Sequence, residues 1–279
     1  MFGWFGSSTK STTVEETKKV MNYTPESLDV LLEYFQDLTG MDFNHKKDVI
    51  LGKLKQFCLN NECFSFEELL EGSKKNEQKR RDLINFLTIN ETYFNREFPQ
   101  IQALPKMINE SSKKVEILSV PCSTGEEVYS IIIHLDEHSI FKDKFNITGL
   151  DIDSTVLQKA KDGVFSKRSL HRVEDATIQK YFSFENDSYC INTQLKNIPL
   201  FELSSIFELN NTKKYDYIFC RNLLIYFDEA TKIRAIQSLI SVLNTEGKIF
   251  FGHSDPIDET LKLKAYYEHG TKFYKKLEE

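Results

Sequence analysis

The sequence has 279 residues, 40% of them hydrophobic, which is enough to bury the core of one large domain or of a domain with a small appendage. A formal net charge of −6 argues against a general nucleic-acid-binding protein, because contacts with phosphates require a surplus of Lys and Arg. No apolar run approaches the roughly 18 residues of a membrane helix, and the start lacks a signal peptide's apolar stretch. The five cysteines form no CxxC pair and have no His at zinc-ligand spacing. These features predict a cytoplasmic, reduced protein that holds no metal and does not insert into membranes.

Residues 1–20 are expected to form a disordered tail, with a weak docking peptide as the alternative. Residues 21–88 show helical periodicity and predict a small all-α N-terminal domain. Thr24 can cap a first helix that Pro25 begins and Gly40 ends. Three further helices are expected over His45–Leu59, after the capping box Ser65-Phe66-Glu67-Glu68, and in the segment that ends with Leu83, Phe86 and Leu87.

A basic cluster lies in this helical region. Residues 74–81 carry five Lys and Arg side chains, and Glu77 is the acid among them. The cluster is either a solvated helix face or a docking face for an acidic partner.

After residue 114 short apolar runs alternate with helical segments, which is typical of βαβ units and a parallel sheet. The predicted strands are Val115–Val120, Phe145–Leu150, Tyr215–Cys220 and Lys248–Gly252, and the helices between them contain Val128–Leu135, Val156–Ala160 and Asp228–Leu243. Gly247 is expected to end the last helix, and Thr271–Lys275 to return as an edge strand. The pattern predicts an α/β fold over residues 89–279, a Rossmann-like doubly wound sheet.

Residues 164–204 fit this alternation poorly. Val173–Phe182 is helix-like, whereas Ser188–Ile191 and Ile198–Leu203 are strand-like. We expect an inserted small β-subdomain there, over the carboxyl end of the sheet, where doubly wound folds bind ligands.

Gly125 and two glutamates lie between the first predicted strand and its helix. A glycine in such a turn lets a ligand approach the backbone. A dinucleotide site would have three glycines at fixed offsets, and Glu126 and Glu127 would repel a pyrophosphate although they suit the helix dipole. The segment therefore favours a ligand with positive charge, such as a sulfonium amino acid, unless the glutamates only cap the helix.

Polar residues also follow the next two strands. Asp151 ends the second strand, where an acid can accept hydrogen bonds from both hydroxyls of a ribose, although Asp153 could simply begin the next helix. Arg221 and Asn222 follow the third strand, in the switch region where a cofactor and a substrate can meet. Tyr226 could belong to the same site or be a packed aromatic.

The linker Thr88–Glu97 joins the two regions and carries Arg96 among polar residues. It could close over a cleft or serve as a plain connector. Together with the three motifs above, it resembles the chemotaxis receptor methyltransferases, the CheR family, over residues 45–274. Tyr217–Asp228 and Gly252–Ser254 carry the most specific part of this match.

The resemblance implies an S-adenosylmethionine (SAM) cofactor, no metal, and transfer of a methyl group to glutamate carboxylates of methyl-accepting chemotaxis receptors. Arg96 and Tyr226 would be the catalytic pair nearest the transferred methyl group. Glu127 would bind the amino-acid end of SAM, and Asp151 its ribose. The cofactor-binding residues implied by the family are Asn90, Thr92, Arg96, Gly125, Glu127, Asp151, Ser204, Ser205, Arg221 and Asn222. The basic N-terminal helices would dock the cytoplasmic helical region of the receptor.

The sequence departs from the family at two places that bear on function. Ser204-Ser205 stand where the family often has Asn-Leu, and Ser183–Thr193 is shorter than in members that bind a receptor's C-terminal pentapeptide. We therefore expect an enzyme that works without that tether. The alternatives are a non-catalytic SAM-binding sensor or scaffold, and a methyltransferase of a non-chemotaxis protein. A nitrogen methyltransferase is disfavoured, because Cys220-Arg221-Asn222 replace the Asn/Asp-Pro-Pro-aromatic motif of such enzymes.

Overall fold

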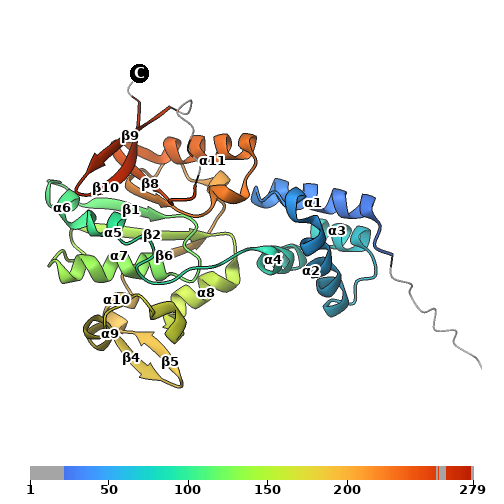
Figure 1. Cartoon of the computed structure of the whole chain (residues 1–279), viewed down its shortest axis with the longest axis horizontal. Helices are drawn as coiled ribbons and strands as arrows, with labels where there is room; N and C mark the ends of the chain where they lie inside the picture. The colour runs from blue at the N-terminus through green and yellow to red at the C-terminus, as the bar shows by residue number, and fades with distance from the viewer. Residues whose placement is uncertain (1–21, 256, 258–261, 278–279) are drawn as a thin grey trace, which may run out of the picture.

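The structure is a computed structural model that describes residues 22–255, 257 and 262–277. A group of helices stands beside an α/β unit, which carries a second, small sheet (Figure 1). The predicted tail, residues 1–20, lies outside the described residues. Within the described part of the chain, none of the helices combines the length and apolar character needed to cross a membrane.

The N-terminal region contains the four predicted helices. They are α1 (Pro25–Thr39), α2 (Lys47–Asn60), α3 (Phe66–Lys75) and α4 (Glu77–Leu87). Thr24 Oγ1 accepts a hydrogen bond from the Ser27 N–H at the start of α1, and Gly40 ends the helix with a φ of 79°. Ser65 Oγ accepts from the Glu68 N–H at the start of α3. The second helix begins at Lys47 because Asn44–Lys46 form one 3₁₀ turn, η1, before it.

The α/β unit is built on a seven-stranded sheet in the order β6-β2-β1-β7-β8-β10-β9. Its strands are β1 (Val115–Ser119), β2 (Phe145–Asp151), β6 (Leu200–Leu203), β7 (Tyr215–Cys220), β8 (Leu243–Phe251), β9 (Leu263–Glu268) and β10 (Thr271–Lys276). The first five strands in this order are parallel, and β10 runs antiparallel to both of its neighbours. The chain builds the sheet outward from β1 in both directions, so a crevice opens between the carboxyl ends of β1 and β7.

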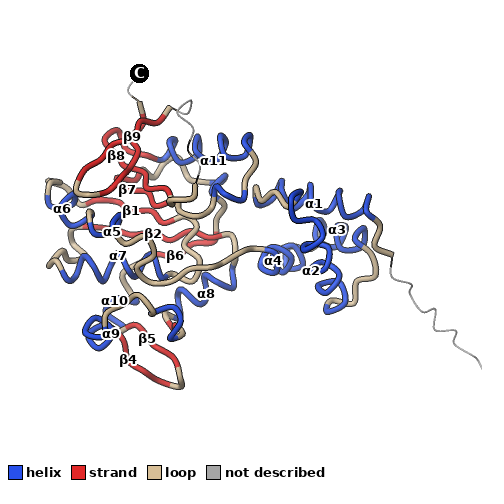
Figure 2. Tube along the Cα trace, in the orientation of Figure 1, coloured by secondary structure: helices blue, strands red, loops and turns tan. Residues whose placement is uncertain are grey.

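Helices cover both faces of this sheet (Figures 1 and 2). They are α5 (Pro99–Gln102), α6 (Leu104–Asn109), α7 (Glu126–Glu137), α8 (Ser154–Asp162) and α11 (Glu229–Val242). Successive strand side chains point to opposite faces, which creates two separate cores. Ile117 and Phe219 pack in the core that contains α7, whereas Leu118 and Ile218 pack in the core that contains α11. The second of these cores continues into the N-terminal helices through residues such as Leu31.

The small sheet has the order β3-β5-β4 and is antiparallel. It consists of β3 (Val164–Phe165), β4 (Phe182–Glu185) and β5 (Ser188–Ile191), accompanied by η2 (Lys167–Leu170), α9 (Asp175–Tyr181) and α10 (Thr193–Lys196). A two-residue turn joins β4 to β5, with positive φ at Asn186 and Asp187. In Figure 1 this sheet lies below α7 and α8.

Three predicted details of the sheet are wrong. The strand ending at Leu203 was assigned to the inserted β-subdomain, but β6 pairs with β2 in the large sheet. Gly247 does not end a helix, because the chain passes directly from α11 into β8 and Gly247 lies within that strand. The C-terminal strand β10 is not the edge, since β9 covers it. The β9 strand escaped prediction because its side chains are mostly exposed and polar, so they show no apolar alternation.

Candidate functional site

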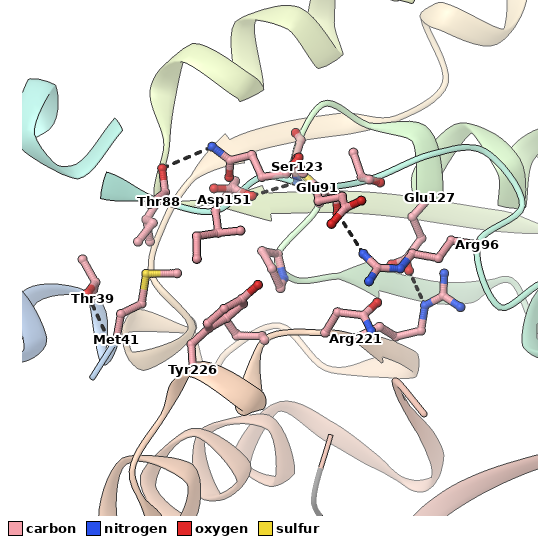
Figure 3. Close-up of a pocket in the computed structure, with 18 residues that line it drawn as sticks. Thr39, Met41, Thr88, Glu91, Arg96, Ser123, Glu127, Asp151, Arg221 and Tyr226 are labelled. Carbon is pink, nitrogen blue, oxygen red and sulfur yellow. Dashed lines mark hydrogen bonds and ion pairs between the residues drawn. The ribbon is translucent and has the colours of Figure 1, made fainter. Parts of the chain in front are cut away.

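A pocket with about 850 Å³ of atom-free space, partly open to solvent, lies at the carboxyl ends of β1, β2 and β7 (Figure 3). The linker between α4 and α5 forms one wall, and the residues after α1 reach it from the helical region. Most of the predicted site residues line this pocket: Asn90, Thr92, Arg96, Glu127, Asp151, Arg221, Asn222 and Tyr226.

Three predicted cofactor residues do not line the pocket. Gly125 has a φ of 90° in the turn before α7, and a Cβ there would lie 3.0 Å from the Ala160 Cβ. The Ser204 N–H donates to the Asp151 carbonyl over 3.0 Å, and the Ser205 hydroxyl accepts from the Phe207 N–H. These residues shape the walls around the pocket, in particular the end of β6, rather than its surface.

Asp151 is almost completely buried at the end of β2. One of its carboxylate oxygens accepts from the Ser123 N–H at 2.8 Å, and the other accepts from the Asp153 N–H at 2.9 Å. Burial raises the pKa of Asp151 to about 6, although these two N–H groups favour its ionised form. Asp153 caps α8, as the simpler interpretation of that residue predicted, and also accepts from the Asn90 amide of the linker at 2.7 Å.

Glu127 and Arg221 form a buried ion pair that faces the pocket (Figure 3). Glu127 accepts from Arg221 Nε and from the Ser119 hydroxyl at 2.7 Å. Glu126, next to it, is buried away from the pocket and accepts from the Thr124 hydroxyl. The pair therefore presents one carboxylate and one guanidinium together, an arrangement that suits an amino acid with a charge of each sign.

Glu97 does not line the pocket but contacts residues that do. The sequence did not single it out as a site residue. Its carboxylate accepts from Asn222 Nδ2 at 3.2 Å and from the His253 N–H at 3.1 Å, and the His253 ring lies 2.9 Å away. Burial alone would raise the pKa of Glu97, but the hydrogen bonds from His253 and the charge of Arg221 hold it below its usual value. The one sequence signal was its place beside Arg96 in the linker.

Arg96 and Tyr226 enter the pocket from different elements. The Arg96 guanidinium donates to the Glu91 carbonyl at 2.8 Å and lies over the Tyr93 ring. Figure 3 shows the Tyr226 hydroxyl pointing into the pocket toward the side where Arg96 lies. Burial raises the pKa of Tyr226, and the charge of Arg96 opposes this shift. Tyr226 is thus a pocket residue rather than only a packed aromatic.

The helical region also contributes to the pocket. Thr39 and Met41 line it from the end of α1, and the Asp42 N–H donates to the Tyr226 carbonyl at 2.8 Å. Sequence reasoning missed both lining residues, because nothing local distinguishes them from other residues at a helix end.

The donor set fits SAM. Asp151 is placed for ribose hydroxyls, and the Glu127–Arg221 pair matches an ammonium and a carboxylate group. Among the residues that the structure describes, no group of three or more His, Cys, Asp or Glu side chains could hold a metal ion.

The doubly wound sheet and this set of hydrogen-bonding groups are typical of SAM-binding methyltransferase domains. Residues 90–273 match the protein family described as "CheR methyltransferase, SAM binding domain". The chain therefore belongs to the CheR methyltransferase family, as its motifs predicted.

Similar proteins cover nearly the whole chain. It is 34% identical over 259 residues to "Chemotaxis protein methyltransferase" of Campylobacter jejuni, covering 91% of this chain and 98% of that protein. It is 35% identical over 238 residues to "Chemotaxis protein methyltransferase 2" of Vibrio cholerae, covering 80% and 83%. A third similar protein, "Chemotaxis protein methyltransferase" of Borreliella burgdorferi, is 29% identical and covers 85% and 90%.

Proposed function

We propose that the chain transfers the methyl group of SAM to glutamate carboxylates of methyl-accepting chemotaxis receptors and so forms methyl esters. The observation that carries this proposal is a single pocket that joins the Glu127–Arg221 pair and Asp151 with Arg96 and Tyr226. The names of the similar proteins support a role in chemotaxis.

At the cofactor end, bound SAM would supply a methyl group on a positively charged sulfur. Asp151 would accept hydrogen bonds from the ribose hydroxyls through the lone pairs that Ser123 and Asp153 leave free. Glu127 would meet the ammonium group, and Arg221 the carboxylate. Asn90 and Thr92 would close the pocket from the linker.

At the substrate end, a glutamate with a reference pKa of about 4.3 is already an anion at neutral pH, so its oxygen can attack without a general base. The task of the site is then orientation, which contributes roughly 7–11 kcal/mol in well-aligned reactions. Arg96 would steer the carboxylate, and the Tyr226 hydroxyl would donate a hydrogen bond near the reacting oxygen.

The receptor would dock on the helical region through its exposed cations Lys46, Lys53, Lys74 and Lys79, which are together called the basic face here. Neighbouring cations are already paired, as Lys47 is with Asp29 and Arg81 is with Glu77. The exposed charges of the basic face would attract an acidic helix bundle. Because the β4–β5 hairpin is short, we propose that docking needs no pentapeptide tether.

The test is transfer of labelled methyl from SAM to a receptor cytoplasmic fragment, followed by treatment with alkali. Label on glutamate that alkali releases as methanol is expected of a carboxyl ester. Tight SAM binding without transfer would contradict the proposal and favour the sensor or scaffold. Label that resists alkali would indicate another kind of acceptor.

A further inference from the structure

A second pocket adjoins the first and shares part of its wall. Asn90, Glu91 and Thr92 of the linker line both pockets. The second pocket is lined further by Tyr93 and, on its other side, by Ser166, Arg168, Ser169 and His171 around η2. We call this pocket, together with the adjacent Arg172, the basic groove. The cofactor-binding arrangement described above does not use its η2 side.

The two walls of the basic groove are tied to each other. The Phe94 N–H donates to the Ser169 carbonyl at 2.9 Å, and Asn95 Nδ2 donates to the Arg172 carbonyl at 3.2 Å. Phe94 is fully buried and packs edge-on against Phe165, 4.8 Å between ring centroids. The linker that carries Arg96 and the segment that carries Arg168 therefore form one unit.

Two guanidinium groups and one imidazole ring gather around one tyrosine ring in this groove. The Tyr93 ring has the Arg96 guanidinium at 5.8 Å, the Arg172 guanidinium at 5.5 Å and the His171 ring at 4.7 Å. Cations over an aromatic face are held in place without a neutralising acid. The guanidinium of Arg96, which faces the methyl-transfer site, and that of Arg172, in the basic groove, therefore share one aromatic ring and lie close together.

The charges of the groove are available to a ligand. Arg168 and Arg172 are exposed, and within the described part of the chain neither forms an ion pair. Glu91 lies on the linker wall and lowers the net positive charge of the groove without removing it. A single acidic side chain is matched better by this charge than a nucleic acid backbone, which requires many cations along its length.

We propose that the basic groove binds an acidic side chain that neighbours the target glutamate in the substrate protein. This inference rests on the proposed function and adds substrate selection to it, because glutamates with an acidic neighbour would be preferred. Esterification of that neighbour would remove the charge that the groove binds. The order in which adjacent glutamates are methylated would then affect the rate.

Binding of synthetic helical peptides to the full chain tests the groove independently of turnover. Each peptide has one central Glu, and its neighbours three and four residues away on both sides are either Glu or Gln. Wild type should bind the acid-flanked peptide about tenfold more tightly, as measured by fluorescence anisotropy at low salt. Arg168→Gln should abolish this preference.

Lys167→Gln is the matched control, because Lys167 is an exposed cation of the same η2 helix but does not line the groove. It should keep the preference, and SAM affinity should be unchanged in both variants. Equal affinity of wild type for the two peptides would contradict the proposal that the basic groove binds an acidic side chain. So would an equal loss of the preference for the acid-flanked peptide in Arg168→Gln and Lys167→Gln. If wild type prefers the acid-flanked peptide yet transfers no methyl group to any glutamate, the binding role of the groove is supported and the proposed function is contradicted.

Discussion

Two arginines of the pocket differ in how they are held. Arg221 is buried in ion pairs with Glu127 and Glu97, so its charge is largely matched inside the protein. Arg96 instead donates to a backbone carbonyl and lies over an aromatic ring, and no carboxylate of the described residues pairs with it. Of these two arginines, Arg96 therefore keeps the charge that is less matched by the protein and more available to a substrate carboxylate.

Arg96→Ala should lower kcat/KM for a receptor fragment by about 100-fold, because a charge-assisted hydrogen bond of about 2.7 kcal/mol is lost. The affinity for SAM should weaken by less than tenfold. Steady-state methylation assays and calorimetry measure the two effects. Arg96→Lys should recover part of the activity, since it keeps the charge. Turnover near that of wild type, with SAM affinity unchanged, would exclude the steering role.

Asp151 is expected to make cofactor binding depend on pH, because we propose that its carboxylate binds the ribose of SAM. Burial raises its pKa to about 6, so the carboxyl is ionised above this pH and protonated below it. The ionised form has free acceptors for ribose hydroxyls, whereas the protonated form has fewer. The affinity for SAM should therefore fall about tenfold between pH 7.5 and pH 5, as measured by calorimetry.

The control for this pH effect is Asp151→Asn, which cannot ionise. It should bind SAM more weakly at pH 7.5 and lose the extra decline toward pH 5. A pH profile that is the same for both proteins would assign the titration to another group.

At the scale of elements, the end of α1 decides how the helical region meets the sheet. Gly40 has a φ of 79°, and a Cβ there would lie 2.8 Å from the Phe207 ring and 2.9 Å from Thr231 Cγ2. The glycine thus serves both as a helix cap and as a point of close packing between α1 and residues near α11. Met41, the next residue, is thereby directed into the pocket.

Gly40→Ala should lower the free energy of unfolding by about 2–3 kcal/mol, because left-handed backbone strain adds to the clash with Phe207. Gly52→Ala is the matched variant in the middle of α2, where a Cβ would meet nothing within 4 Å. It should raise the free energy of unfolding by about 0.5–1 kcal/mol. Denaturant unfolding measures both, and a Gly40→Ala variant as stable as wild type would contradict the packing role of Gly40.

At the scale of the whole molecule, charge is distributed unevenly. The chain carries a net charge of −6, and even residues 22–88 hold 12 Asp and Glu against 9 Lys and Arg, so the lysines of the basic face and the arginines of the basic groove are local exceptions on an acidic protein. An acidic partner would therefore be repelled by most of the surface and guided to these places.

Replacing Lys53 and Lys74 with Glu should raise KM for the receptor fragment about tenfold with little change in kcat, because docking precedes chemistry. The effect should shrink as salt is increased. Lys142→Glu is the control, since Lys142 is exposed in the loop before β2, at the amino end of the sheet. An unchanged KM in the double variant would contradict the proposal that the receptor docks on the basic face.

The sequence by itself determined the elements whose signals are local. Thr24, Pro25 and Gly40 delimit α1 because capping and backbone conformation are set within a few residues. Tyr215–Cys220 was predicted with its observed bounds because, apart from Asp216, it is a run of aromatic and apolar residues, as expected of a strand buried on both faces. The acid at the end of β2 and the Arg-Asn pair after β7 followed from the rule that doubly wound sheets bind ligands at these ends.

Tertiary structure alone decided the remainder, because it depends on partners far away in the sequence. β6 is a strand of the large sheet because β2 offers it an edge, and its own four residues do not reveal this. Met41 reaches the pocket only because α1 packs against the segment around Tyr226, and Glu97 becomes an organising acid only when His253, more than 150 residues later, folds against it. Local propensity cannot encode such pairings, since their stabilising contacts exist only after the chain has closed on itself.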